Sequence, residues 1–169
     1  MPLDKSDLFN FLEELNKELG KKITLIAVGG TAMTLLDLKP STIDIDFTIP
    51  SSDFPEYKRA EKNVPHGYKI DIYLDGCIFS QNLPDDYLVK STEIANLEHL
   101  SLRALHPVDI VVTKIGRLHE KDLADIEKCI KAYDLKKEQI KNRAVNVTYI
   151  GKQEYYNSNL ECVLEKFFQ

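Results

Sequence analysis

The sequence predicts an α/β core followed by a helical C-terminal region. Strand-like and helical segments alternate over the first half of the chain, whereas the segments after His106 all have helical character. The clearest strand is Ile23–Val28, a nearly continuous apolar run that is typical of a strand covered on both faces. We expect a single domain over residues 1–169, with the core in residues 1–105 and the helical region, residues 106–169, packed on it.

The first half begins with a predicted amphipathic helix, in which Asp4 or Ser6 caps the start and Gly20 follows the end. The predicted elements, in chain order, are a helix over 3–19, a strand over 23–28, a helix over 31–38, a strand over 43–49, a helix from Ser51 or Ser52 to about Lys62, and a strand over 67–76. Within the helix that ends near Lys62, Tyr57 is expected to face inward.

The second half is less regular at its start. Its sequence predicts strands over Tyr87–Ile94 and Leu100–Leu105. Four helices are predicted after them, over residues 107–120, Asp122–Tyr133, Lys136–Val145 and Asn159–Phe168. Pro107 suits the first turn of a helix, where its missing N–H leaves no bond unmade.

Two aspartates stand out in the segment STIDIDFTIP, where Asp44 and Asp46 alternate with apolar residues from Ile43 to Ile49. Because side chains alternate between the faces of a strand, both carboxylates are expected on one face. Their like charges repel, and a divalent cation such as Mg²⁺, which prefers hard oxygen ligands, relieves that repulsion most directly. The alternative is a pair of solvated residues on an exposed strand face.

A third aspartate, Asp71, occupies a second alternating strand, with Ile70 and Ile72 on either side of it. An exposed position on an edge strand is again the alternative. Asp75 precedes Gly76 and is expected in a turn.

The glycine pair Gly29-Gly30 lies between a strand and a helix, followed by Thr31. Glycines at a helix start let the backbone approach a phosphate closely, and the helix N–H groups bind it, with the Thr31 hydroxyl as a further donor. An ordinary strand-to-helix turn is the alternative. A phosphate cradle together with a carboxylate metal site is the equipment of phosphoryl or nucleotidyl transfer.

These motifs together resemble the DNA polymerase β-like nucleotidyltransferases, over roughly residues 20–130. That superfamily has a Gly-Gly or Gly-Ser at a helix start, an acid-x-acid strand and a third acid on a later strand. Within it, GGTAM and STIDIDF are most similar to the minimal and abortive-infection-type (AbiEii-like) group, some of which are toxins of toxin–antitoxin pairs. The resemblance implies a nucleotidyltransferase fold, with a mixed β-sheet flanked by helices.

The resemblance also implies roles for particular residues. Asp44, Asp46 and Asp71 would be catalytic and would bind Mg²⁺ (or Mn²⁺), while Gly29, Gly30 and Thr31 would hold the phosphates of a nucleoside triphosphate. A lysine on a helix after the core, here Lys114, would contact the phosphates as well. Asp122 and Asp125, in the segment KDLADI, would orient neighbouring basic groups.

Some of these residues have simpler interpretations. Lys114 is also compatible with a solvated helix position, and Asp122 and Asp125 with acids favoured at a helix N-terminus. Many relatives carry an arginine shortly before the acid-x-acid strand, whereas here the nearest basic residue is Lys39, a point charge without a bidentate fork.

The expected activity is Mg²⁺-dependent transfer of a nucleotidyl group from a nucleoside triphosphate to an acceptor hydroxyl, with release of pyrophosphate. The sequence does not identify the acceptor, which is an RNA, a protein or a small molecule. Two alternatives stay open: a nucleotidyltransferase-like module without turnover, acting as half of a toxin–antitoxin pair, and a regulatory protein that binds RNA through its lysine-rich C-terminal helices.

Composition bears on the class of protein and on its cellular location. The net charge of −5 argues against wholesale wrapping of nucleic acid, and 43% hydrophobic content suits a globular core. No apolar run is long enough to span a bilayer, and no secretory leader is expected at the N-terminus. Three scattered cysteines favour reduced thiols and a cytoplasmic location.

Overall fold

A computed structural model describes residues 1–169. Contacts divide the chain into two compact units, which are described here one at a time. The first unit consists of Met1–Gly76 and Ser91–Leu105, and the second of Cys77–Lys90 and His106–Gln169. The segment Cys77–Lys90 thus groups with the C-terminal helices, whereas the sequence analysis assigned it to the core. That the chain forms a single domain stays a prediction.

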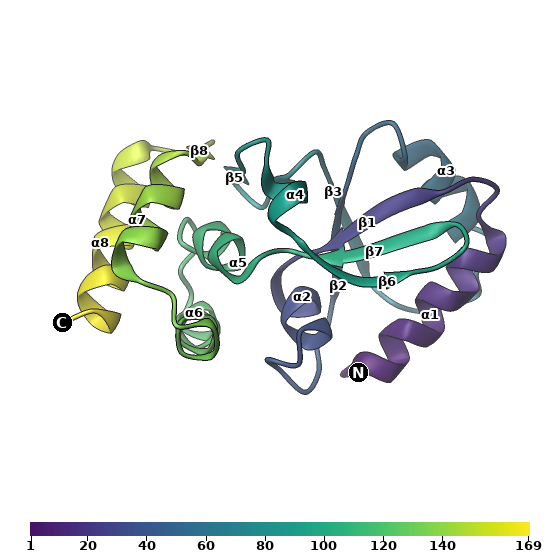
Figure 1. Ribbon diagram of the computed structural model, residues 1–169, viewed down its shortest axis with the longest axis horizontal. Helices are drawn as coiled ribbons and strands as arrows, with labels where there is room; N and C mark the ends of the chain where they lie inside the picture. The colour runs from purple at the N-terminus through teal and green to yellow at the C-terminus, as the bar shows by residue number, and fades with distance from the viewer. The chain divides into compact units, whose positions relative to one another are not determined.

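The first unit is a mixed five-stranded sheet with helices (Figure 1). Its elements are α1 (Lys5–Glu18), β1 (Ile23–Ala27), α2 (Gly29–Leu35), β2 (Ile45–Ile49), α3 (Phe54–Glu61), β3 (Ile70–Leu74), β6 (Thr92–Asn96) and β7 (Leu100–Ala104). The strand order is β3-β2-β1-β7-β6, with β2–β3 and β1–β7 parallel and β1–β2 and β6–β7 antiparallel. The predicted α+β fold with a mixed sheet and flanking helices is therefore confirmed.

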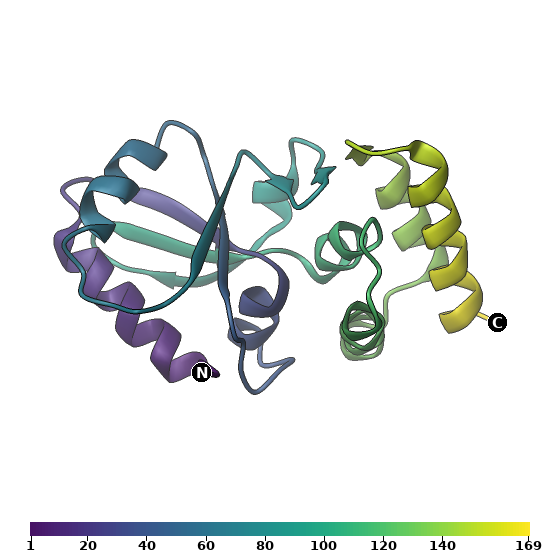
Figure 2. The same cartoon turned by 180° about the vertical axis from the view of Figure 1, so that it is seen from behind.

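Helix α1 forms where its apolar spacing predicted. Asp4 caps it, since its carboxylate accepts from the Asp7 backbone N–H at 2.8 Å. In return, the Asp4 backbone N–H donates to the Asp7 carboxylate at 3.0 Å. Its inner residues Phe11 and Leu15 are buried. Helices α1 and α3 contact each other, and Figure 2 shows the same pair from behind. In α3, Tyr57 is buried as predicted.

Strand β2 is buried on its apolar face, where Ile45, Phe47 and Ile49 are fully covered. The predicted strand began two residues too early, because Ile43 lies in the bend before β2 with 72% of its surface exposed. The opposite face is also covered at its far end, where Thr48 is buried and its hydroxyl accepts from the Gly76 N–H at 2.9 Å.

Strand β3 lies at the edge of the sheet and pairs only with β2. Its alternation predicted a buried face of Ile70, Ile72 and Leu74, yet Leu74 is exposed and both isoleucines are only half-buried. An edge strand has a neighbour on one side only, so its side chains receive less cover.

The second unit is mainly helical. Its elements are β4 (Cys77–Ile78), β5 (Gln81–Asn82), α4 (Tyr87–Lys90), α5 (Pro107–Lys114), α6 (Glu120–Tyr133), α7 (Lys137–Val145), β8 (Thr148–Tyr149) and α8 (Gln153–Phe167). The three two-residue strands form a small antiparallel sheet in the order β4-β5-β8. The predicted helices after Pro107 are present, although the first ends at Lys114 and not near residue 120, and the last begins at Gln153 and not at Asn159.

Two local predictions were wrong. The strand predicted over Tyr87–Ile94 is instead α4 followed by the start of β6. The Tyr87 N–H donates to the Pro84 carbonyl, so a turn that begins at Pro84 leads into the helix. Helix α3 is preceded by Asp53, and neither Ser51 nor Ser52 caps it.

No helix of the chain has the length and apolar character that crossing a membrane requires.

Candidate active site

Two of the predicted acids face each other across neighbouring strands of the first unit. Strands β2 and β3 are parallel, and their register places Asp46 directly opposite Asp71. Adjacent strands lie about 4.8 Å apart, and residues opposite each other in register share a face of the sheet. The two carboxylates therefore emerge side by side, with the Asp71 side chain 42% exposed.

The third acid, Asp44, lies in the bend that leads into β2, two residues before Asp46. Its backbone carbonyl accepts from two hydroxyls, Thr31 Oγ1 at 3.1 Å and Thr42 Oγ1 at 2.9 Å. These bonds fix the bend to α2, through Thr31, and to the preceding Thr42. Asp44 was predicted on the strand but lies just before β2.

Thr31 links the glycine turn to the strand that carries Asp46. Its buried hydroxyl accepts from the Asp46 backbone N–H at 2.9 Å and donates to the Asp44 carbonyl. A hydroxyl has one proton to donate. Because the Asp44 carbonyl receives that proton, the geometry favours a positioning role for Thr31, and its phosphate contact stays a prediction.

The glycine turn approaches the start of β2 closely. Gly29 has a φ of 52°, a backbone conformation that glycine adopts without steric cost. A Cβ at Gly30 would lie 2.9 Å from Thr42 Oγ1, so only glycine fits without displacing that side chain. Just before the turn, the Val28 N–H donates to the Asp46 carbonyl at 3.1 Å, which fastens the turn to β2.

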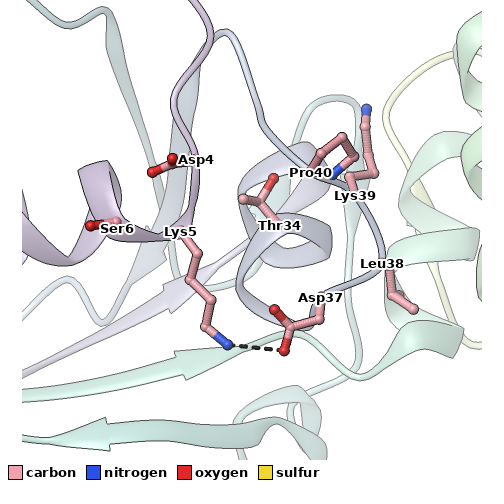
Figure 3. Close-up of a pocket in the computed structure, with 8 residues that line it drawn as sticks. All are labelled: Asp4, Lys5, Ser6, Thr34, Asp37, Leu38, Lys39 and Pro40. Carbon is pink, nitrogen blue, oxygen red and sulfur yellow. Dashed lines mark hydrogen bonds and ion pairs between the residues drawn. The ribbon is translucent and has the colours of Figure 1, made fainter.

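Lys39 brings a positive charge to this turn. Its Nζ lies 3.9 Å from the position that a Cβ would take at Gly30. Figure 3 shows the Lys39 amine pointing away from the nearby ion pair of Lys5 and Asp37, whose charged atoms are 3.1 Å apart. Lys39, which the sequence singled out as the nearest basic residue before the acid-x-acid segment, thus lies beside the glycine turn.

Lys69 is a site residue that the sequence analysis did not select. Its Nζ lies 3.8 Å from Asp71 Oδ2. The signal was present, because Lys69 precedes Asp71 by two residues and a strand places such residues on one face. Lys69 therefore supplies part of the positive charge near the aspartates, for which the sequence suggested a metal alone.

Lys114 belongs to a buried ion network in the second unit. Its Nζ lies 3.3 Å from Asp122 and 3.2 Å from Asp125, and its side chain is 3% exposed. Arg117 forms a bidentate pair with Asp122 at 2.8 and 2.9 Å. Burial alone would raise the pKa of Asp122, but the Arg117 bonds, the Lys114 charge and the His119 N–H hold it lower, at about 2.

The alternative of a solvated helix position for Lys114 is therefore wrong, since its amine is buried among carboxylates. Asp122 and Asp125 do contact neighbouring basic groups, as the resemblance implied. Asp122 also caps α6, because its side chain accepts from the His119 N–H at 3.0 Å. Whether Lys114 reaches a phosphate stays a prediction.

The carboxylates fit a metal that arrives with its substrate. No three Asp, Glu, His or Cys side chains in residues 1–169 lie close enough together to hold a metal ion by themselves. Mg²⁺, however, is usually held by one or two carboxylates together with waters and substrate phosphates. Asp46 and Asp71, side by side on β2 and β3, are a suitable pair for that arrangement.

A family model described as "Nucleotidyltransferase of unknown function (DUF6036)" matches residues 6–169, nearly the whole chain. None of the curated proteins matches the chain.

Proposed function

The chain belongs to this family of nucleotidyltransferases, and from that membership we propose that it transfers a nucleotidyl group from a nucleoside triphosphate to an acceptor hydroxyl. The observation that carries the proposal is the register of β2 and β3, which sets Asp46 opposite Asp71. Two carboxylates side by side, next to a glycine turn with a lysine, suit the binding and reaction of a triphosphate.

The proposed reaction is an in-line displacement. The acceptor hydroxyl oxygen forms a bond to the α-phosphorus, while the bond from that phosphorus to the oxygen bridging to the β-phosphate breaks. Asp71 takes the hydroxyl proton as general base, and pyrophosphate leaves with the electron pair of the broken bond. Asp71 suits this role because it lies on the edge strand, where its partly exposed carboxylate is open to an incoming molecule.

Asp46 and Asp71 would hold Mg²⁺, whereas Asp44, in the bend before β2, does not complete a three-carboxylate site with them. When bound between these carboxylates and the triphosphate, Mg²⁺ stabilises negative charge on the phosphoryl oxygens. Lys69 adds a nearby positive charge, with its Nζ 3.8 Å from Asp71 Oδ2.

The phosphates would lie on the other flank of β2, at the glycine turn. Val28 gives α2 no side-chain cap, so the first N–H groups of the helix, at Gly29 and Gly30, suit an anionic ligand. Lys39 Nζ, beside Gly30, adds a full positive charge to that flank. Thr31 would contribute by holding the turn against β2.

Calorimetry of nucleotide binding tests the assignment of these residues. We expect the double variant Asp46→Asn with Asp71→Asn to lose Mg²⁺-dependent ATP binding while its circular dichroism stays that of the native protein. Asp37→Asn is the matched control, because Asp37 is an exposed acid of the same unit that pairs with Lys5. Unchanged Mg²⁺–ATP affinity in the double variant would show that these carboxylates are not the site.

A second candidate function is a binding module of the same fold without turnover, of the abortive-infection-type group and acting within a toxin–antitoxin pair. One observation favours it: Lys114, expected to neutralise the leaving pyrophosphate, has its charge engaged by Asp122 and Asp125. Labelled nucleotides separate the two functions, because a module binds ATP without passing label to any acceptor.

A further inference from the structure

A cavity of about 450 Å³ lies in the first unit, with Asp44 in its wall. Its walls include Leu3, Asp7, Ile43, Asp44, Tyr68 and Lys69. Sites for small molecules typically enclose about 300–1,000 Å³, so the cavity has the size for one small compound.

The cavity adjoins the Asp46–Asp71 pair along the direction of the strands. The Ile45 N–H donates to the Lys69 carbonyl at 3.1 Å, so the segments entering β2 and β3 are already paired there. Asp44 and Lys69 each precede one of the facing aspartates by two residues. Asp44 and Lys69 therefore place the cavity next to the segments that lead into the facing aspartates.

The cavity is also on the side of the edge strand. In the sheet order β3-β2-β1, the glycine turn follows β1, on one flank of β2, whereas Asp71 lies on the other. The residues that line the cavity come from the N-terminal segment and α1, from the bend before β2 and from the segment before β3, and none comes from the glycine turn or α2. A molecule in this cavity therefore approaches Asp71, on the flank away from the proposed phosphate site.

The walls combine an apolar surface with acidic groups. The Tyr68 ring is held by stacking on His66 at 5.8 Å between centroids and by the edge of Phe11 at 5.8 Å, while 38% of the residue stays exposed. Ile43 adds an exposed apolar side chain. The wall at Leu3 is fixed by backbone bonds to Thr42 of 2.7 and 2.9 Å.

From these observations we propose that the cavity binds the acceptor, and that the acceptor is a small, uncharged or cationic compound with a hydroxyl next to an apolar or ring portion. The inference rests on the proposed function, since it places the acceptor hydroxyl next to the general base of that reaction. The ring portion packs on Tyr68 and Ile43, and the hydroxyl extends toward Asp71.

Charge argues against a nucleic acid as the acceptor. Binding a polyanion depends on several lysines or arginines that neutralise phosphates. Here the lining offers one basic side chain, Lys69, which is itself paired with Asp71, and the amino group of Met1, beside the two carboxylates of Asp7 and Asp44. The cavity therefore lacks the set of cations that a polyanion requires, whereas a neutral or positively charged compound does not need them.

Transfer of label to three acceptor pools tests the inference. The full chain is incubated with Mg²⁺ and each α-³²P-labelled nucleoside triphosphate, together with the dialysable fraction of a cell extract, total RNA or extract protein. We expect label in a dialysable product. Ile43→Trp places a large side chain at the cavity without entering the core, and Tyr68→Leu removes the ring. Each should lower transfer at limiting acceptor by at least about tenfold, the usual scale of a lost pocket contact.

The controls separate this inference from the proposed function. Both cavity variants should bind Mg²⁺–ATP as the native chain does, and Val145→Trp, which changes an exposed residue of the second unit, should transfer normally. If the native chain does not bind Mg²⁺–ATP, the proposed function itself fails. If it binds ATP but labels RNA or protein, labels no dialysable compound, or is indifferent to both cavity variants, the acceptor inference alone is overturned.

Discussion

At the scale of single residues, Thr31 connects the two halves of the candidate site. Its hydroxyl joins the glycine turn to β2 by accepting from the Asp46 N–H and donating to the Asp44 carbonyl. A valine has the same shape but no hydroxyl, so Thr31→Val leaves the Asp46 N–H without its partner, while the Asp44 carbonyl keeps only its bond from Thr42 Oγ1. We expect the free energy of unfolding to fall by about 1–3 kcal/mol in urea titrations. We also expect Mg²⁺–ATP affinity to fall in calorimetry, because the turn is no longer held against the carboxylate strand.

Thr34→Val is the matched control for that substitution. Thr34 is also buried on α2, but its hydroxyl donates to the Gly30 carbonyl within the same helix, at 2.8 Å. It should cost stability without a comparable loss of affinity, and Thr31→Ser should restore both properties. Equal ATP affinities for Thr31→Val and Thr34→Val would rule out the linking role.

Sequence reasoning proposed the acids of the candidate site, but it did not contain their pairing across the sheet. The alternation around Asp46 and Asp71 is a local signal, and it indicated correctly that each lies on a strand. Their register is non-local, because it depends on how two strands separated by α3 pair, and no short pattern contains that information. The two bonds of Thr31 are non-local as well, because they join α2 to the start of β2, whereas the ion pair of Lys69 with Asp71 is a local contact between residues two apart.

At the scale of elements, prediction succeeded where a segment was long enough to show its period. Helices α1 and α6, each of 14 residues, and the apolar strand β1 appear close to their predicted bounds. Helix α4 has only four residues and the strands of the small sheet have two, too few for any periodicity to appear. Their positions are set instead by distant partners, such as Gln81 with Tyr149.

Helix α6 carries a pH-dependent contribution to stability through Asp122. Its pKa falls from 3.8 to about 2 in the folded chain, because Arg117, Lys114 and the His119 N–H outweigh the effect of burial. A pKa lowered on folding stabilises the protein above pH 3.8, and this stabilisation is lost as the pH falls toward 2. The shift corresponds to roughly 2 kcal/mol, at about 1.4 kcal/mol per pH unit.

Urea unfolding of the native chain and of Asp122→Asn, followed between about pH 6 and about pH 2, measures this contribution. The native chain should lose roughly 2 kcal/mol more than the variant across that range. Parallel pH dependences for the two proteins would mean that the Asp122 network does not stabilise the fold through its charge.

At the scale of the whole molecule, the proposed chemistry lies in one of two compact units. The facing aspartates, the glycine turn, Lys39 and the proposed acceptor cavity all belong to the first unit, whereas Lys114 and its acids belong to the second. The sequence placed residues 77–90 in the core because they lie between its predicted strands. In the structure this segment pairs with β8 near the C-terminus, through a contact that joins residues far apart in the chain.

The most direct test of the account follows the label from two positions of one nucleotide. The native chain, with Mg²⁺ and the dialysable fraction of a cell extract, receives the nucleotide labelled either at the α-phosphate or at the γ-phosphate. Nucleotidyl transfer predicts a labelled product from the α-labelled nucleotide only, released label in pyrophosphate from the γ-labelled one, and neither product with Asp71→Asn. A product labelled from the γ-phosphate, or one formed equally well by Asp71→Asn, would contradict it.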